Sequence, residues 1–248
     1  MTYNIHSCRG SDGRADPGRI AEVIARCAPD IVALQEVDVA RARSGGIDQA
    51  TAIASLLRMD AHFHPALHLA EEKYGDAILT TLPSRLVKAG PLPSAGEPRG
   101  AIRVAVDLGG TDLHVVNTHL GLRRGERMRQ AAILLGPGWL GSPQGGRTVL
   151  MGDLNAGPRS AAYHMLARTM ADVQVEAGGK PAPTFPSRFP MLRLDHILVG
   201  DGIGVVSAEV PSDILIRGAS DHLPLLATLD IAPQTATTAR PGRVRAVS

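Results

Sequence analysis

The stretch VLMGDLNAGP, residues 149–158, leads from an apolar segment directly into a carboxylate and an amide. Residues i and i+2 of an extended chain point to the same side. We therefore expect Asp153 and Asn155 to face one point beyond the end of a strand. This spacing predicts a polar site at the end of a buried segment.

Further polar residues follow or precede strand-like apolar segments elsewhere in the chain. A polar residue at one strand end is ordinary, because caps and turns need such side chains. A whole set of oxygen-bearing and imidazole groups at such ends is harder to explain by turn formation alone. The set comprises Asn4 in TYNIH, Glu36 in LQEVD, His119 in NTHL, Asp195 in RLDHI, and Asp221 with His222 in SDHLPL.

The ligand types in this set indicate a hard divalent cation. Carboxylates and amides without cysteine suit Mg²⁺ or Mn²⁺, which keep several waters and lean on few protein carboxylates plus substrate phosphate. Zinc is disfavoured. The segment HFHPALH, with His62, His64 and His68, has no carboxylate at a metal-binding helical spacing and includes a proline, so we interpret it as a loop or partial-core segment.

The elements that would position these residues alternate between helices and strands. In DPGRIAEVIARC, Asp16 can cap a helix that begins at Pro17, and the following DIVALQEV predicts a buried strand with Glu36 at its C-terminal end. The alternation on either side of Gly109 and Gly110 predicts an antiparallel hairpin. Further helices are expected in DQATAIASLLRM, GERMRQAAILL and SAAYHMLARTM, and further strands in GDAILTTLP, RTVLMGDLN, RLDHILVG and HLPLLATLDI. The pattern favours a layered α/β domain.

Composition limits the class of protein. The 248 residues are 44% hydrophobic, enough for a real core, and carry a formal charge of only +2. Cys8 and Cys27 form no disulfide framework or metal motif. The sequence opens without a signal-peptide pattern and has no membrane-spanning run, so a cytoplasmic location is expected. We expect one catalytic domain over residues 1–232 and a flexible tail over 233–248, which is small, polar and basic.

The ordered motifs TYNIH, LQEVD, YGDAILT, VVNTHLG, GDLNAGP, RLDHILV and SDHLPL resemble the endonuclease/exonuclease/phosphatase superfamily. The resemblance extends from Tyr3 to about Ile231, in the family's order. It implies a four-layer α/β sandwich, in which two mixed β-sheets pack face to face with helices outside. It also implies an active site at one edge of the sheet pair.

The resemblance implies a role for each motif residue. Glu36 would be the principal metal ligand, Asn4 beside it would contact the ion directly or through water, and Asp221 would be a further ligand. Asp153 and Asn155 would orient the attacking water and bind the phosphoryl group. His222 would pair with Asp195, which fixes its tautomer, and His119 would contact a phosphate oxygen or assist proton transfer. Weaker candidates near the motif strands are Arg99 and Arg123 for a substrate phosphate, with Tyr74 and His6 near the pocket.

The motifs LQEVD and NTHL differ from the DNA-repair branch and are similar to the branch containing deoxyribonuclease I, sphingomyelinases and bacterial phosphodiesterases. Aromatic residues make up 3% of the chain, too few for a stacking surface that binds single strands. We therefore expect a Mg²⁺- or Mn²⁺-dependent phosphoesterase. A phosphodiesterase that acts on a lipid head group or a small molecule is favoured over a phosphomonoesterase. A nuclease and a non-catalytic binding module on the same fold are the alternatives, and the sequence leaves the oligomeric state open.

Overall fold

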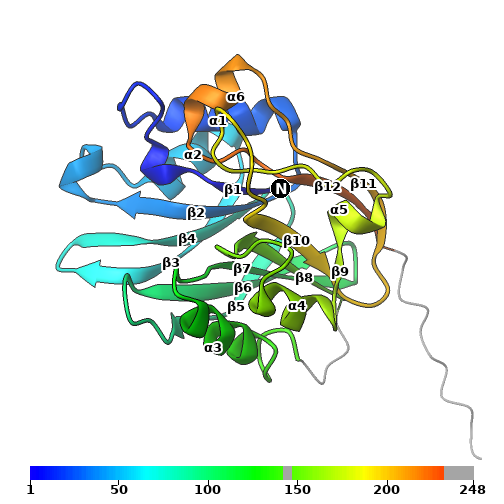
Figure 1. Cartoon of the computed structure of the whole chain (residues 1–248). Coiled ribbons are helices and arrows are strands. Elements are labelled where there is room, and N and C mark those ends of the chain that lie inside the picture. Colours follow the sequence, from blue (N-terminus) through cyan, green and yellow to red (C-terminus); the bar gives the residue numbers. More distant parts are fainter. Residues whose placement is uncertain (142–146, 232–248) are drawn as a thin grey trace, which may run out of the picture.

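The structure is a computed structural model that describes residues 1–141 and 147–231. Two large sheets pack face to face, and helices cover their outer faces (Figure 1). The expected four-layer α/β sandwich is confirmed. The predicted tail over 233–248 lies outside the described residues.

The first sheet is mixed and has the strand order β1-β2-β4-β3. Strand β1 runs parallel to β2, and the other neighbours are antiparallel. Its strands are β1 (Thr2–Asn4), β2 (Ile31–Val39), β3 (Asp60–Leu69) and β4 (Glu72–Thr80). Helices α1 (Pro17–Cys27), α2 (Gln49–Leu57) and α6 (Ile214–Ala219) lie over its outer face (Figure 1).

The second sheet is also mixed, with the order β5-β6-β7-β8-β10-β9 and one parallel pair, β7 with β8. Helices α3 (Arg124–Leu134) and α4 (Ala161–Ala167) cover its outer face, while α5 (Val173–Glu176) follows β9 directly in the chain. Its strands are β5 (Ser84–Leu92), β6 (Arg99–Asp107), β7 (Asp112–His119), β8 (Arg147–Asp153), β9 (Ala171–Asp172) and β10 (Asp195–Val199). A separate ribbon pairs β11 (Gly204–Glu209) with β12 (Leu226–Asp230).

Alternation along the central strands produces three apolar layers. In β2, Val32 and Leu34 pack outward under the helices, while Ala33 faces the second sheet. In β8, Val149 faces the first sheet and Leu150 packs against α3 and α4. Because successive side chains of a strand point to opposite faces, each apolar strand contributes to two layers at once.

The local signals for the first helix and the hairpin are confirmed. The Asp16 side chain accepts a hydrogen bond from the backbone N–H of Arg19, and Pro17 is the first helical residue. Strands β6 and β7 pair antiparallel, and the turn uses positive φ angles at Gly109 and Gly110. Glycine adopts such angles without a Cβ clash.

For HFHPALH the loop interpretation is wrong, because His62, His64 and His68 all lie in β3, whereas the partial-core interpretation holds, because His62 and His64 are half-buried and Phe63 packs against a core. A proline is tolerated there because β3 is the edge strand of its sheet. The pairing with β4 also shifts register beside Pro65, which absorbs the missing N–H donor.

Two amides connect the sheets beneath one edge of the sandwich. The Gln35 side chain donates to Asn117 Oδ1 at 2.8 Å, and Asn117 Nδ2 donates to the carbonyls of Leu34 and Ala77, both at 2.8 Å. Gln35 and Asn117 are fully buried. Gln35 Oε1 has no partner among the described residues, but the other polar atoms of the two amides are paired. Such buried pairing holds two sheets in one register, and this edge carries the polar strand-end residues.

Candidate active site

A cleft with a volume of about 500 Å³ opens at this edge. Most of the predicted site residues meet there. Asn4 and Asp195 do not line the cleft but bond to residues that do, and Arg123, the residue before α3, is not a lining residue. The predicted residues that line it are His6, Glu36, Tyr74, Arg99, His119, Asp153, Asn155, Asp221 and His222.

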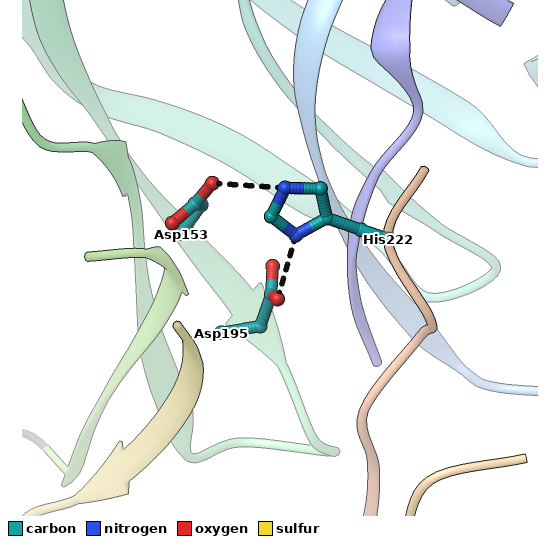
Figure 2. A group of neighbouring side chains, drawn as sticks. All are labelled: Asp153, Asp195 and His222. Carbon is teal, nitrogen blue, oxygen red and sulfur yellow. Dashed lines mark hydrogen bonds and ion pairs between the residues drawn. The ribbon is translucent and has the colours of Figure 1, made fainter. Parts of the chain in front are cut away.

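The centre of the cleft is a histidine between two aspartates (Figure 2). His222 Nδ1 lies 2.8 Å from Asp195 Oδ2, and its Nε2 lies 3.6 Å from Asp153 Oδ2. Strands β8 and β10 pair with Asp153 directly opposite Asp195, which places both carboxylates at one sheet edge. All three side chains are buried.

This arrangement sets the charge states of the group. Burial lowers the pKa of His222, but the charge and hydrogen bond of Asp195, followed by the charge of Asp153, outweigh it and raise the pKa to about 10. Burial, together with the charge of Asp195, raises the pKa of Asp153 to about 7. Without a metal ion His222 is therefore an imidazolium at neutral pH.

A second histidine, His119, approaches the same carboxylate oxygen of Asp153. His119 Nε2 lies 3.5 Å from Asp153 Oδ2, and His119 Nδ1 lies 2.9 Å from Arg99 Nη1. A guanidinium can only donate, so Nδ1 accepts and the ring proton is assigned to Nε2, toward Asp153. Burial, and next the charges of Arg99 and His222, lower the pKa of His119 well below its ordinary value. His119 is therefore a neutral hydrogen-bond donor to the cleft.

Glu36 reaches the cleft by a route that differs from the predicted one. It lies inside β2 and not at its end, in the left-handed conformation with φ of +59°, where the register with β4 shifts between Leu34 and Val37. This bulge redirects one side chain out of the sheet, a common device beside active sites. Burial raises the pKa of Glu36, and a hydrogen bond from Asn4 opposes the rise.

Asn4 links the two halves of the site. Its Nδ2 donates to Glu36 Oε1 at 3.0 Å and to Asp153 Oδ2 at 3.1 Å, while its Oδ1 accepts from the backbone N–H of His6 at 3.1 Å. Asn4 ends β1, which pairs with β2 and packs against β8 and β10 of the second sheet, so one amide reaches both sheets. It holds the two carboxylates at a common point.

Asp153 and Asn155 both line the cleft, as expected, but the chain between them is not extended. Asn155 has a φ of +46°, and its backbone N–H donates to Asp153 Oδ1 at 2.8 Å. This Asx-type turn brings the amide back toward the strand end. Asn155 Nδ2 donates to the carbonyl of Leu120 at 2.9 Å and lies 3.0 Å from His119 Nε2.

The donor set fits a divalent cation. Four carboxylates, those of Glu36, Asp153, Asp195 and Asp221, gather in and beneath the cleft, and the pKa values of Glu36 and Asp153 are raised by burial. A bound cation would offset this crowding of charge. Over residues 1–141 and 147–231, the group with ligand atoms within 4.8 Å of one another is Asp153, Asp195 and His222. However, the Asp195 to His222 hydrogen bond already uses two of its atoms.

Several lining residues were missed because they carry no motif. Glu97 lies 2.9 Å from Arg99. The centroid of the Phe185 ring lies 4.7 Å from that of the His222 ring, and the two rings are tilted by 44°. The others are Ser7, Arg9, Arg43, Ser44 and Leu122. From the sequence, Arg9 and Arg43 would not by themselves have indicated a site, because isolated surface arginines are common.

Comparison with known proteins now gives this site a context. The profile of the Endonuclease/Exonuclease/phosphatase family matches residues 1–222. The chain belongs to this family. Family members hydrolyse phosphoester bonds and in general depend on a divalent metal ion. In the parts of the chain that the structure describes, no helix is long and apolar enough to cross a membrane.

The family relatives are diverse. Uncharacterized protein YbhP of Escherichia coli K12 is 32% identical over 169 residues, which span 65% of this chain and 64% of the relative. A family protein from Beutenbergia cavernae is 25% identical with a TM-score of 0.72, over 93% of this chain and 70% of that one. The mannosyl-6-phosphatase Bt3783 of Bacteroides thetaiotaomicron has the same fold, with 20% identity, a TM-score of 0.72, and 92% and 98% of the two chains covered.

Proposed function

We propose that this chain is a Mg²⁺- or Mn²⁺-dependent phosphodiesterase that acts on a small molecule or a lipid head group by metal-assisted attack of water. The observation that carries the proposal is the convergence of Glu36, Asp153 and the Asp195–His222 pair on one cleft. A binding module on this fold needs none of these buried charges, whose desolvation costs stability. Their retention supports catalysis.

The metal ion would be held by Glu36 and Asp221, with Asn4 orienting Glu36 through the 3.0 Å hydrogen bond. When bound, such an ion supplies Lewis-acid stabilisation of the charge that develops on the phosphoryl oxygens. Hard carboxylate oxygens suit Mg²⁺ or Mn²⁺. The remaining chemistry falls to residues that hold water and substrate.

Asp153 accepts hydrogen bonds from Asn4 and from the backbone of Asn155, which hold its carboxylate toward the cleft. A carboxylate with a pKa of about 7 can accept a proton from water at neutral pH. His222, protonated and oriented by Asp195, supplies positive charge to the phosphoryl oxygens and a proton for the leaving group.

His119 and Asn155 complete the phosphoryl site. Their Nε2 and Nδ2 atoms are 3.0 Å apart, and both are donors with the assigned tautomer. With this tautomer the two N–H groups cannot bond to each other, so an anionic oxygen in contact with both atoms would accept from both, and we assign them to substrate binding. Because His119 is neutral, proton transfer is left to His222 and Asp153.

The cleft supports a small substrate. Its volume of about 500 Å³ lies within the range of small-molecule pockets, about 300–1,000 Å³. Among its lining residues, only Tyr74 and Phe185 are phenyl-type aromatics, and the Phe185 ring already contacts the His222 ring in a tilted arrangement. A nucleic-acid site would favour several stacking side chains along a basic groove.

The proposal is tested with a substrate panel of bis-p-nitrophenyl phosphate, p-nitrophenyl phosphate, phospholipids and duplex DNA, each with Mg²⁺, Mn²⁺ or EDTA. We expect metal-dependent hydrolysis with kcat/KM highest for a diester that is not DNA. A higher value for the monoester would favour phosphatase activity, as the name of the Bacteroides thetaiotaomicron protein states for that relative. A higher value for DNA would favour the nuclease alternative.

A further inference from the structure

The cleft continues past the reacting groups to two arginines that the proposed reaction does not use. Arg9 and Arg43 line the same cavity as Glu36, Asp153 and His222. They also lie against each other, since Arg9 Nη2 lies 3.5 Å from the backbone carbonyl of Arg43. Two guanidinium groups that line one cleft can bind an anion if their charge is not neutralised by a carboxylate and if some of their N–H donors have no protein acceptor.

Arg43 is held rigidly but keeps one side free. Its Nε and Nη2 bond to the two oxygens of the buried Asp38 at 2.8 and 2.7 Å, and Nη2 also donates to Ser7 Oγ at 3.1 Å. The guanidinium also lies over the Tyr74 ring, 5.3 Å from its centroid. Among the described residues, Nη1 has no protein acceptor, and the Arg43 side chain, which lines the cleft, is 46% exposed. Because the Arg43 guanidinium is already fixed by these contacts, it loses little conformational entropy when it binds an anion.

Arg9 supplies charge that no carboxylate offsets. Within the described ranges, no acidic oxygen lies within 4.0 Å of its guanidinium. Arg99 differs, since it is buried and bonds to Glu97 and His119. Arg43 is balanced by Asp38, so Arg9 provides the net positive charge and Arg43 the oriented donors.

The backbone that brings Arg9 to the cleft is strained. His6, Ser7 and Cys8 are consecutive and all left-handed, with φ of 47°, 50° and 59°. A residue with a Cβ adopts this conformation only at a cost in stability. Buried Gln49 holds the turn, because its Nε2 donates to the carbonyl of Ser7 at 2.7 Å and its Oε1 accepts from the N–H of Asp38 at 2.9 Å. One amide thus fixes the segments that carry both arginines.

We propose that Arg9 and Arg43 form a second anion site, and that the substrate is a small phosphoester whose leaving group carries a further carboxylate or phosphate. This inference rests on the proposed function, because the scissile phosphate must occupy the centre of the cleft. The second anion would accept from Arg43 Nη1 and lie against the charge of Arg9. The site selects substrates by a charge that takes no part in bond cleavage.

The test uses compounds that differ in one anionic group. We would compare 6-phosphogluconate with sorbitol 6-phosphate, and 3-phosphoglycerate with glycerol 3-phosphate, at two distances between phosphate and carboxylate. Each is titrated by calorimetry into the Mg²⁺-loaded protein, and each is assayed as a competitive inhibitor of bis-p-nitrophenyl phosphate hydrolysis. In at least one pair we expect the acid to bind about tenfold tighter, as for a charge-assisted hydrogen bond.

The decisive variant is Arg9→Gln, because no buried carboxylate depends on Arg9 for its charge. It should reduce the preference for the acid to about twofold or less, the change expected when a charge-assisted contact is lost. Arg43→Lys keeps a cation opposite Asp38 but lacks the second donor nitrogen, and should reduce the preference as well. The matched control is Arg168→Gln, an exposed arginine outside the cleft, which should keep the preference of the parent protein.

The outcomes separate the two proposals. If neither acid binds better than the phosphoester that lacks the carboxylate, or if a preference survives both Arg9→Gln and Arg43→Lys, the second anion site is wrong. If no phosphoester of the panel is hydrolysed with either metal, the proposed function is wrong. The calorimetric preference still reports on Arg9 and Arg43 in that case, because it requires no turnover.

Discussion

His222 and Asp195 are joined by a 2.8 Å hydrogen bond across 27 residues of chain, and the other imidazole nitrogen lies 3.6 Å from Asp153. Asp195 begins β10 and Asp153 ends β8, and these strands pair with the two aspartates opposite each other. The antiparallel register therefore creates a carboxylate pair, and His222 bridges it. Four predictions follow from this relationship and from its surroundings.

The first concerns the Asp195–His222 unit. We expect Asp195→Asn and His222→Gln each to lower kcat/KM by about 10²–10⁴-fold, and the double variant to lose little more than the worse single variant. A base or acid and the carboxylate that orients it act as one group, so their losses do not add. Steady-state kinetics of the three variants on bis-p-nitrophenyl phosphate measures this. Fully multiplicative losses would show that the two residues act separately.

The second concerns the charge states of the two histidines. In metal-free protein, His222 should remain protonated through neutral pH and titrate near pH 10, while His119 stays neutral above pH 6.5. Imidazole ¹⁵N shifts measured from pH 5 to 10.5 would report both. Asp195→Asn should lower the pKa of His222, because the partner charge that raises it is gone.

The sign of the linked stability effect follows from the same shift. The folded pKa of His222, about 10, exceeds the ordinary value of 6.5, so its contribution to stability is complete below pH 6.5. That contribution is lost as pH rises from 6.5 to 10. Urea unfolding of metal-free protein should thus show a steeper loss of stability over this interval than the His222→Gln variant does. Equal slopes would contradict the assignment.

The third concerns Glu36. Because burial raises its pKa, the ionised carboxylate destabilises the metal-free fold at neutral pH. Glu36→Gln should leave the metal-free melting temperature equal to or above that of the parent, yet abolish the rise that Mg²⁺ or Mn²⁺ produces. We expect kcat/KM to fall by about 10²–10³-fold. The exposed Glu22→Gln is the control and should retain the metal-dependent rise. Near-normal activity of Glu36→Gln would move the metal site elsewhere.

The fourth concerns a buried ion network outside the cleft. Asp172 pairs with Arg193 and accepts from Tyr163 at 2.8 Å, and His196, 3.4 Å from it, bonds through Nε2 to the carbonyl of Ala156. Burial raises the pKa of Asp172, but His196, then Arg193, reverse the effect and lower it. Its stabilisation is therefore present above the ordinary pKa of 3.8 and lost as pH falls through the lower folded value.

Asp172→Asn should lower the free energy of unfolding at pH 7 by about 3–5 kcal/mol, because Arg193 stays buried without its partner. The control is Asp112→Asn, which breaks a more exposed pair with Arg85 and should lower the free energy of unfolding much less. Urea unfolding at pH 7 measures both. Equal costs for the two variants would show that the buried network contributes no more than a surface pair.

Local patterns in the sequence predicted the elements and the types of residue at their ends. Capping by Asp16, the apolar period of α1 and the Gly109–Gly110 turn depend on neighbours only a few residues apart, so they can be read without the fold. The ordered motifs also identified the family. The same local patterns predicted that Glu36 ends its strand and that the chain is extended from Asp153 to Asn155, and both predictions are wrong. A bulge and a left-handed turn depend on contacts with distant strands, which local patterns do not contain.

Only the tertiary structure decided which charges are free. Arg99 is a predicted phosphate contact that lines the cleft, and the fold also pairs it there with His119 and Glu97. Arg9 and Arg43 lie in no motif, yet Gln49 and Asp38 bring them to the cleft. The charge of an arginine is visible in a sequence, but its partner is not, because that partner comes from a segment far along the chain. Which arginine can meet a substrate is therefore a property of how the two sheets and their loops pack.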